Sequence, residues 1–132
     1  MNSFPTAGQI GRGDSVPSSS AGSQSPTFKL IVQTLTSSGI TQAQLAEAVG
    51  ASTRTIQNWA SGQAAPKGGK IRRLLDLRYL VELLQTAYTD EGVQIWLHSR
   101  NRNLGAERPI DLILADRLDE VVEEAERLAG AM

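Results

Sequence analysis

Apolar residues recur at three- and four-residue spacing from Phe28 to Leu128, which is the period of helices that bury one face. Glycines, prolines and short polar runs interrupt the pattern where loops between helices are expected. No segment alternates apolar and polar residues convincingly, as a half-buried strand would. The sequence therefore predicts an all-α fold, in which an N-terminal helix-turn-helix bundle is joined by a long helix to a small C-terminal helical domain.

Cap and stop residues predict the limits of the individual helices. Thr41 and Gln44 have the spacing of a capping box, Ser52 can cap the next helix, and Gly50 and Gly62 are stop signals. Helices are therefore expected over residues 27–37, 41–50, 52–61, 70–88, 91–97, 109–116 and 117–128.

The helix expected over residues 70–88 is apolar around more than one stripe. Its apolar residues are Ile71, Leu74, Leu75, Leu77, Leu80, Val81 and Leu84. A surface helix needs one such stripe, so the wider distribution predicts a central helix or one at a dimer contact.

Residues 1–26 are rich in Ser, Gly, Pro and Thr and carry few large apolar side chains. Such a segment buries too little surface to offset the entropy of ordering, which predicts a disordered tail. The rest of the chain divides into a helix-turn-helix domain over residues 27–68 and a C-terminal helical domain over residues 69–132.

The 132 residues include no cysteine and one histidine, His98. This composition excludes disulfides, cysteine metal sites and histidine-based clusters or triads, so neither an enzyme nor a metal or cofactor is expected. The sequence begins without the features of a signal peptide and has no run approaching the ~20 apolar residues of a membrane helix. A soluble cytoplasmic protein is expected.

The formal net charge of −1 conceals an uneven distribution. Residues 28–80 carry seven basic and two acidic side chains, whereas residues 81–132 carry five arginines and eleven carboxylates. A basic half can approach the phosphates of a nucleic acid, while an acidic half suits a different partner.

Residues 42–61 meet the steric requirements of a helix-turn-helix. Ala46 is small where two helices would cross, and Gly50 stands in the turn, where a left-handed backbone angle costs glycine little. Four residues are expected to face inward and hold the two helices together: Leu45, Val49, Ile56 and Trp59.

The third helix is predicted to enter the major groove of DNA. Its outward residues are expected to be Thr53, Arg54, Gln57 and Asn58. Arginine pairs with guanine, amides pair with adenine, and hydroxyls contact bases or phosphates.

Gln42 and Ser52 are predicted to donate to phosphates. Sequence-independent attraction is expected from Lys67, Lys70, Arg72 and Arg73. Because Arg54 is the one charge on the outward face, we expect a dimer on paired half-sites.

The stretch TQAQLAEAVGASTRTIQNWASGQAAP strongly resembles the helix-turn-helix of the Xre/Cro repressor family. The matching residues are Thr41, Gln42, Leu45, Ala46, Gly50, Ser52, Ile56, Trp59, Gly62 and Pro66. The resemblance implies sequence-specific DNA binding.

A second resemblance covers the C-terminal half. This half resembles the C-terminal domain of Xre/MbcA/ParS-type antitoxins, whose signature is W…N…LGG..P.DLL. The residues that follow the same order are Trp96, Ser99-Arg100-Asn101, Leu104-Gly105 and Arg108-Pro109-Ile110-Asp111-Leu112-Ile113. Two positions depart from that signature: Gly105 is followed by Ala106, and a glycine usual before the final helix is replaced near Asp116.

The C-terminal residues also have plainer interpretations. Pro109 suits the first position of a helix, with Asp111 complementing the helix dipole. Trp96 is expected in the core. The carboxylates Asp119, Glu120, Glu123, Glu124 and Glu126 are expected on a solvated helix face, although with the arginines of the preceding loop they could form a charged partner surface.

The family resemblance implies an antitoxin that binds a RES-domain toxin, an enzyme that degrades NAD, through its C-terminal domain and represses its own operon. A homodimer, and a higher-order complex with the toxin, are expected. The implied toxin contacts are Arg100, Arg102, Asn103, Arg108, Gly130, Ala131 and Met132. The alternative is a stand-alone Xre-family repressor whose C-terminal half dimerises or senses a ligand.

Overall fold

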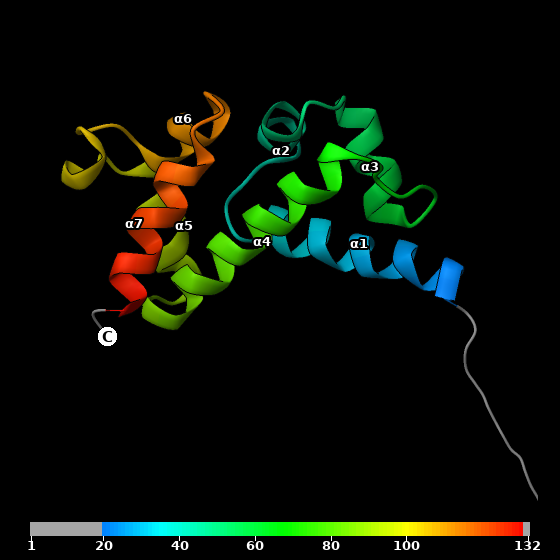
Figure 1. Ribbon diagram of the computed structural model, residues 1–132, viewed down its shortest axis with the longest axis horizontal. Helices are drawn as coiled ribbons and strands as arrows, with labels where there is room; N and C mark the ends of the chain where they lie inside the picture. The colour runs from blue at the N-terminus through cyan, green and yellow to red at the C-terminus, as the bar shows by residue number, and fades with distance from the viewer. Residues whose placement is uncertain (1–19, 131–132) are drawn as a thin grey trace, which may run out of the picture.

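The computed structural model describes residues 20–130, with side chains from residue 27 onward. Within this range the chain forms α-helices and a short 3-10 turn, and its one extended pairing is an isolated bridge between Asn101 and Glu107. Figure 1 shows the helix-turn-helix elements at one end of a long helix and the C-terminal elements at the other. The all-α prediction is confirmed.

Three helices form the N-terminal half. They are α1 (Ser20–Ser37), α2 (Gln42–Val49) and α3 (Thr53–Ser61). The limits of α2 and α3 agree with the predicted ones to within a residue or two, whereas α1 begins seven residues before the predicted start at Thr27. Helix α1 thus includes residues 20–26, which the sequence assigned to the tail. Extending a formed helix costs little per residue, so burial alone does not decide where it begins. Residues 1–19 of the predicted tail lie outside the described residues.

Helix α4 (Gly69–Ala87) is the central element that the sequence predicts. It contacts α1 and α2 on one side and α5 and α7 on the other. Its buried residues are Leu74, Leu77, Leu80, Val81 and Leu84. Leu75 and Tyr79 remain exposed on the same helix.

The C-terminal half contains α5 (Asp90–His98), η2 (Arg102–Leu104), α6 (Pro109–Leu114) and α7 (Leu118–Gly130). Pro109 occupies the first turn of α6, as predicted. Helix α6 ends two residues earlier than expected, because Asp116 adopts a left-handed backbone with φ 64° that cannot continue a helix.

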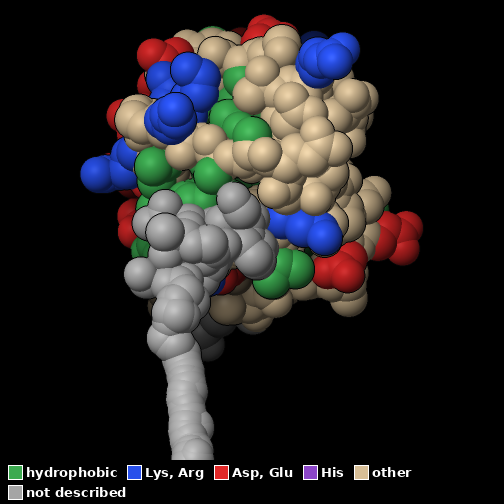
Figure 2. Space-filling view, turned by 90° about the vertical axis from the view of Figure 1, so that its right-hand side faces the viewer, with side chains coloured by type: hydrophobic (Ala, Val, Ile, Leu, Met, Phe, Trp, Pro, Cys, Tyr) green, Lys and Arg blue, Asp and Glu red, His purple; other side chains and the backbone are tan. Residues whose placement is uncertain are grey.

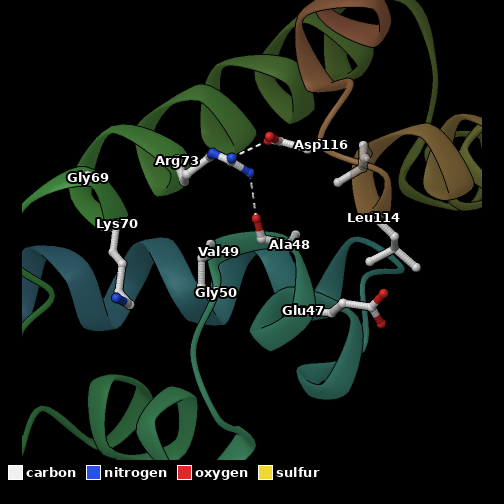
Figure 3. A pocket seen from close by; sticks show the side chains of 10 residues that line it. Glu47, Ala48, Val49, Gly50, Gly69, Lys70, Arg73, Leu114 and Asp116 are labelled. Atoms are coloured by element: carbon white, nitrogen blue, oxygen red, sulfur yellow. Dashed lines mark hydrogen bonds and ion pairs between the residues drawn. The ribbon is translucent and has the colours of Figure 1, made fainter.

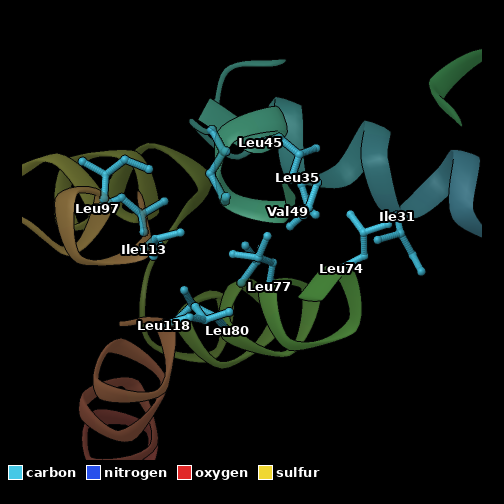
Figure 4. Packing of buried hydrophobic residues seen from close by; sticks show 14 of the residues in the cluster. Ile31, Leu35, Leu45, Val49, Leu74, Leu77, Leu80, Leu97, Ile113 and Leu118 are labelled. Carbon is cyan, nitrogen blue, oxygen red and sulfur yellow. The ribbon is translucent and has the colours of Figure 1, made fainter. Parts of the chain in front are cut away.

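A single buried cluster runs through both halves. Figure 4 shows Leu45 of α2 lying between Leu35 and Val49 on one side and Leu97 and Ile113 of the C-terminal half on the other. Each such side chain contributes about 1.5–3 kcal/mol on burial. The two halves therefore share one core, and their relative orientation is set by packing across α2, α4 and α6.

Candidate nucleic-acid interface and partner surface

The turn between α2 and α3 has the geometry that its sequence predicts. Thr41 accepts from Gln44 N at 3.0 Å, and the Gln44 side chain accepts from Thr41 N at 3.0 Å, which completes the capping box. Gly50 ends α2 in the left-handed region with φ 77°. Ser52 caps α3 by accepting from Thr55 N at 3.1 Å. These local bonds fix where the second helix of the pair begins.

The inward side of the pair is also as predicted. Leu45, Val49, Ile56 and Trp59 are all buried, and Ala46 is buried where the helices approach. Because these side chains fill the space between α1, α2 and α3, the direction of α3 is fixed by the core and does not depend on the presence of DNA.

The outward face of α3 is open to solvent along most of its length. Thr53, Arg54 and Gln57 are exposed and Asn58 is half-buried. Among the described side chains none forms an ion pair or hydrogen bond with Arg54, so its five donors are available to a ligand. The Gln57 amide lies 3.4 Å from Gln42 Oε1, which places the first residue of α2 beside the outward face of α3. Figure 2 shows this end of the molecule, where uncharged surface separates the lysine and arginine side chains.

The basic residues that follow α3 divide into two groups. Lys67 and Arg72 are exposed, and Arg72 forms an ion pair with Asp76 at 3.4 Å. Arg73 instead donates to the Ala48 carbonyl at 2.8 Å and forms an ion pair with Asp116 (Figure 3). The last carbonyls of a helix lack partners within it, and a guanidinium on a neighbouring helix can satisfy one. Arg73 is therefore bonded within the chain at both of these groups, and its contribution to DNA attraction stays a prediction.

Arg73 lies in a hollow of about 420 Å³ between the two halves of the chain. Glu47 and Gly50 line it from the helix-turn-helix, Lys70 lines it from α4, and Leu114 lines it from α6 (Figure 3). The hollow therefore separates the end of α2 from the α6–α7 turn, and Arg73 bridges it.

The loop between α5 and α6 is built around Asn101. Its backbone N–H donates to the Glu107 carbonyl at 2.9 Å, and its side chain accepts from Asn103 N at 2.9 Å. Gly105 and Ala106 both have left-handed backbones, with φ values of 70° and 65°. The two departures noted in the sequence, Ala106 and Asp116, are thus the two non-glycine residues with positive φ among those described.

Glu124 departs from the prediction of a solvated carboxylate face. Its side chain is buried, accepting from Asn103 Nδ2 at 3.0 Å and from both ends of the Arg127 guanidinium at 2.6 and 3.0 Å. The bonds from Arg127 and then Asn103 hold the pKa of Glu124 below its usual range, against the opposing effect of burial. The periodicity could have indicated this, because residue 124 falls between Val121 and Ala125 on the inward side of α7.

The predicted partner contacts lie mainly on the exposed α5–α6 loop. Arg108 pairs with Asp111 at 2.8 Å and holds the pKa of that carboxyl below its usual range. Arg100 donates to the Ala106 carbonyl at 3.2 Å, and Arg102 is exposed without an ion pair among the described residues. Gly130 is the last residue of α7, far along the chain from the loop, whereas Ala131 and Met132 lie outside the described residues.

No helix among the described residues is long and apolar enough to cross a membrane. In the same part of the chain, no group of three or more His, Asp or Glu side chains is arranged to hold a metal ion.

Known proteins resemble both halves. Residues 31–77 match the helix-turn-helix family model, and residues 81–130 match the model for the antitoxin Xre/MbcA/ParS C-terminal toxin-binding domain. The chain is 40% identical over 96 residues to a probable mycobacterial cidal antitoxin, Rv3188, of Mycobacterium tuberculosis; the match covers 73% of this chain and 82% of that protein. It is 31% identical over 75 residues to the mycobacterial cidal antitoxin MbcA of Mycobacterium bovis, covering 57% of this chain and 66% of that protein.

A solved structure has the same fold. It is the crystal structure of the M. tuberculosis MbcT-MbcA toxin-antitoxin complex, and one of its chains matches with a TM-score of 0.64 at 25% identity. The match covers 79% of this chain and 95% of that one.

Proposed function

The chain belongs to the Xre/MbcA/ParS antitoxin family, and we propose that it binds and neutralises a RES-domain, NAD-degrading toxin and represses its own operon. The observation that carries this proposal is the pairing of two modules in one chain. A helix-turn-helix with an unobstructed outward face is packed through α4 against a domain of the toxin-binding family.

The proposed operator contacts are those expected from the sequence. Arg54, Gln57 and Asn58 would meet base edges, and Gln42, Ser52, Thr53 and Lys67 would meet bases or phosphates. Support comes from the exposure of Arg54 and Gln57 and from the position of Gln42 beside them. A helix held at a fixed angle by buried residues needs little reorganisation on binding, which favours affinity.

A homodimer is the proposed DNA-binding form. One arginine on the outward face gives a single monomer few strong contacts, and two half-sites read together compensate for this. The exposed residues of α4 support a self-contact: Leu75 is 42% and Tyr79 is 43% exposed. The Tyr79 hydroxyl donates to Glu126 at 2.8 Å, which leaves the face of its ring for another chain.

Toxin neutralisation is tested by co-expression with the product of the neighbouring gene. We expect that product to arrest growth and deplete cellular NAD when expressed alone, and we expect this chain to restore both. An antitoxin function is overturned if the neighbouring product is toxic and this chain neither binds it nor restores growth. Binding to the chain's own promoter without any rescue would instead identify the stand-alone repressor.

A further inference from the structure

An apolar groove lies on α5. This helix belongs to the C-terminal half, at the end of the molecule away from α3 (Figure 1). Its volume is about 280 Å³, and Tyr88, Ile95 and Trp96 supply its apolar lining. Ile95 is 59% exposed, Tyr88 is exposed, and Trp96 is half-buried against the core. Large apolar side chains gathered at one exposed groove mark an interaction site more often than isolated ones do.

Gly92 gives the groove its shape. A Cβ atom at residue 92 would lie 2.9 Å from Tyr88 Cβ, closer than real side chains approach. The glycine therefore lets Tyr88 lie against the backbone of α5, with Ile95 and Trp96 one turn further along the same helix. The apolar lining is thus built on α5 and on Tyr88 just before it, and the α5–α6 loop closes the other end of the groove.

Arg100 lies at the edge of the same groove. Its Nη1 donates to the Ala106 carbonyl at 3.2 Å, and no carboxylate among the described residues forms an ion pair with it. The nearby carboxylate of Asp111 is already paired with both ends of Arg108, at 2.8 and 2.9 Å. Since a guanidinium has five N–H donors, most of those on Arg100 remain for a partner.

From this geometry we infer that the groove of Tyr88, Ile95 and Trp96 is the anchor on which the toxin docks. An apolar side chain of the toxin fills the groove, and a toxin carboxylate beside it pairs with Arg100. The groove lies within residues 81–130, the range that matches the toxin-binding domain. Aromatic residues and arginine around an apolar pocket also have the composition of interface hot spots.

This inference rests on the proposed antitoxin function and adds a specific contact surface to it. The groove is distant from α3, so a toxin bound there leaves the DNA-binding helix open. It also differs from the exposed face of α4, where Leu75 and Tyr79 support the proposed dimer contact.

Binding of the purified, catalytically inactivated product of the neighbouring gene tests the inference. Ile95→Ser removes an apolar contact, and Leu30→Ser is its matched control, because Leu30 is a large aliphatic residue with a similar exposure of 62% on α1. We expect Ile95→Ser to weaken binding at least tenfold, as loss of a hot-spot side chain does, and Leu30→Ser to change it less than twofold. Arg100→Glu should weaken binding at least as much and should make it less sensitive to salt.

Several outcomes would overturn the inference. In the first, the wild-type chain binds the toxin, and Ile95→Ser and Arg100→Glu bind it with the same affinity. In the second, Ile95→Ser binds the toxin normally but no longer self-associates in analytical sedimentation. That result would show that a second copy of this chain occupies the groove. If the wild-type chain does not bind the toxin, the proposed function itself fails. Circular dichroism on each variant separates lost binding from lost folding.

Discussion

Arg73 of α4 forms an ion pair with Asp116 in the turn between α6 and α7, and the same guanidinium donates to the Ala48 carbonyl at the end of α2. One side chain thus bonds to a residue of the helix-turn-helix and to a residue of the C-terminal half. The packing of α2 against α4 and α6 supports the same arrangement. The helix-turn-helix and the C-terminal half are therefore joined by polar bonds as well as by the buried cluster that they share.

The first prediction concerns this bridge. Arg73→Ala should lower the free energy of unfolding by about 1–2 kcal/mol, since it leaves the Ala48 carbonyl unpaired and removes a partly exposed ion pair. Urea unfolding followed by circular dichroism measures the change. Arg72→Ala is the control, because Arg72 precedes it on the same helix and its side chain is 81% exposed in the ion pair with Asp76. Equal effects of the two substitutions would show that the bridge contributes nothing.

A second prediction concerns Glu124. Its pKa is lowered in the folded state, so its bonds stabilise the protein above the unfolded-state pKa of about 4.3. That contribution is lost as the pH falls through the lower, folded-state pKa. Glu124→Gln should therefore lower stability at pH 7 and flatten its decline below pH ~4.5.

Glu123→Gln is the matched control for this pH dependence, because Glu123 is the exposed neighbour without a partner among the described residues. Thermal unfolding between pH 7 and pH ~3 gives the comparison, over the range in which carboxylates titrate. Asp111 and Glu120 have pKa values lowered by arginine partners as well, but they contribute equally to both variants. If the melting temperature falls with pH equally in the two variants, Glu124 has no special role.

The success of sequence-based prediction depended on how local each determinant was. Thr41, Gly50 and Ser52 act on residues one turn away, and the structure confirms all three caps. Arg73 and Asp116 are 43 positions apart, and Asn103 and Glu124 are 21 apart. No periodicity specifies such pairings, because they exist only after the helices have packed. The start of α1 was missed for a related reason, since composition measures burial and not the ease of extending a helix.

A third prediction concerns the left-handed residues. Ala106 has φ 65°, a conformation that costs a side chain about 1–2 kcal/mol and glycine much less. Ala106→Gly should therefore stabilise the fold by about 0.5–1 kcal/mol after allowing for the greater entropy of the unfolded chain. Ala115→Gly is the control, since Ala115 has a φ of −90° and should lose stability on substitution. A destabilised Ala106→Gly would show that the strain is absent.

The last prediction concerns the DNA-binding helix. Arg54 is exposed without a partner on the outward face, where it can pair with a guanine, so Arg54→Ala should weaken binding to the chain's own promoter by about 1–3 kcal/mol and relax specificity at one position. Lys67→Ala is the contrasting variant, because an exposed lysine at a phosphate should weaken binding to all sequences alike and reduce the salt slope by about 1. Fluorescence anisotropy with promoter and scrambled duplexes at several salt concentrations separates the two effects.

If Arg54→Ala weakens binding to both duplexes equally, Arg54 contacts the DNA backbone. Sequence discrimination must then come from the amides of Gln57 and Asn58 or from the spacing of two half-sites. Because the outward face has so little charge, this result would place most of the specificity in assembly of the dimer.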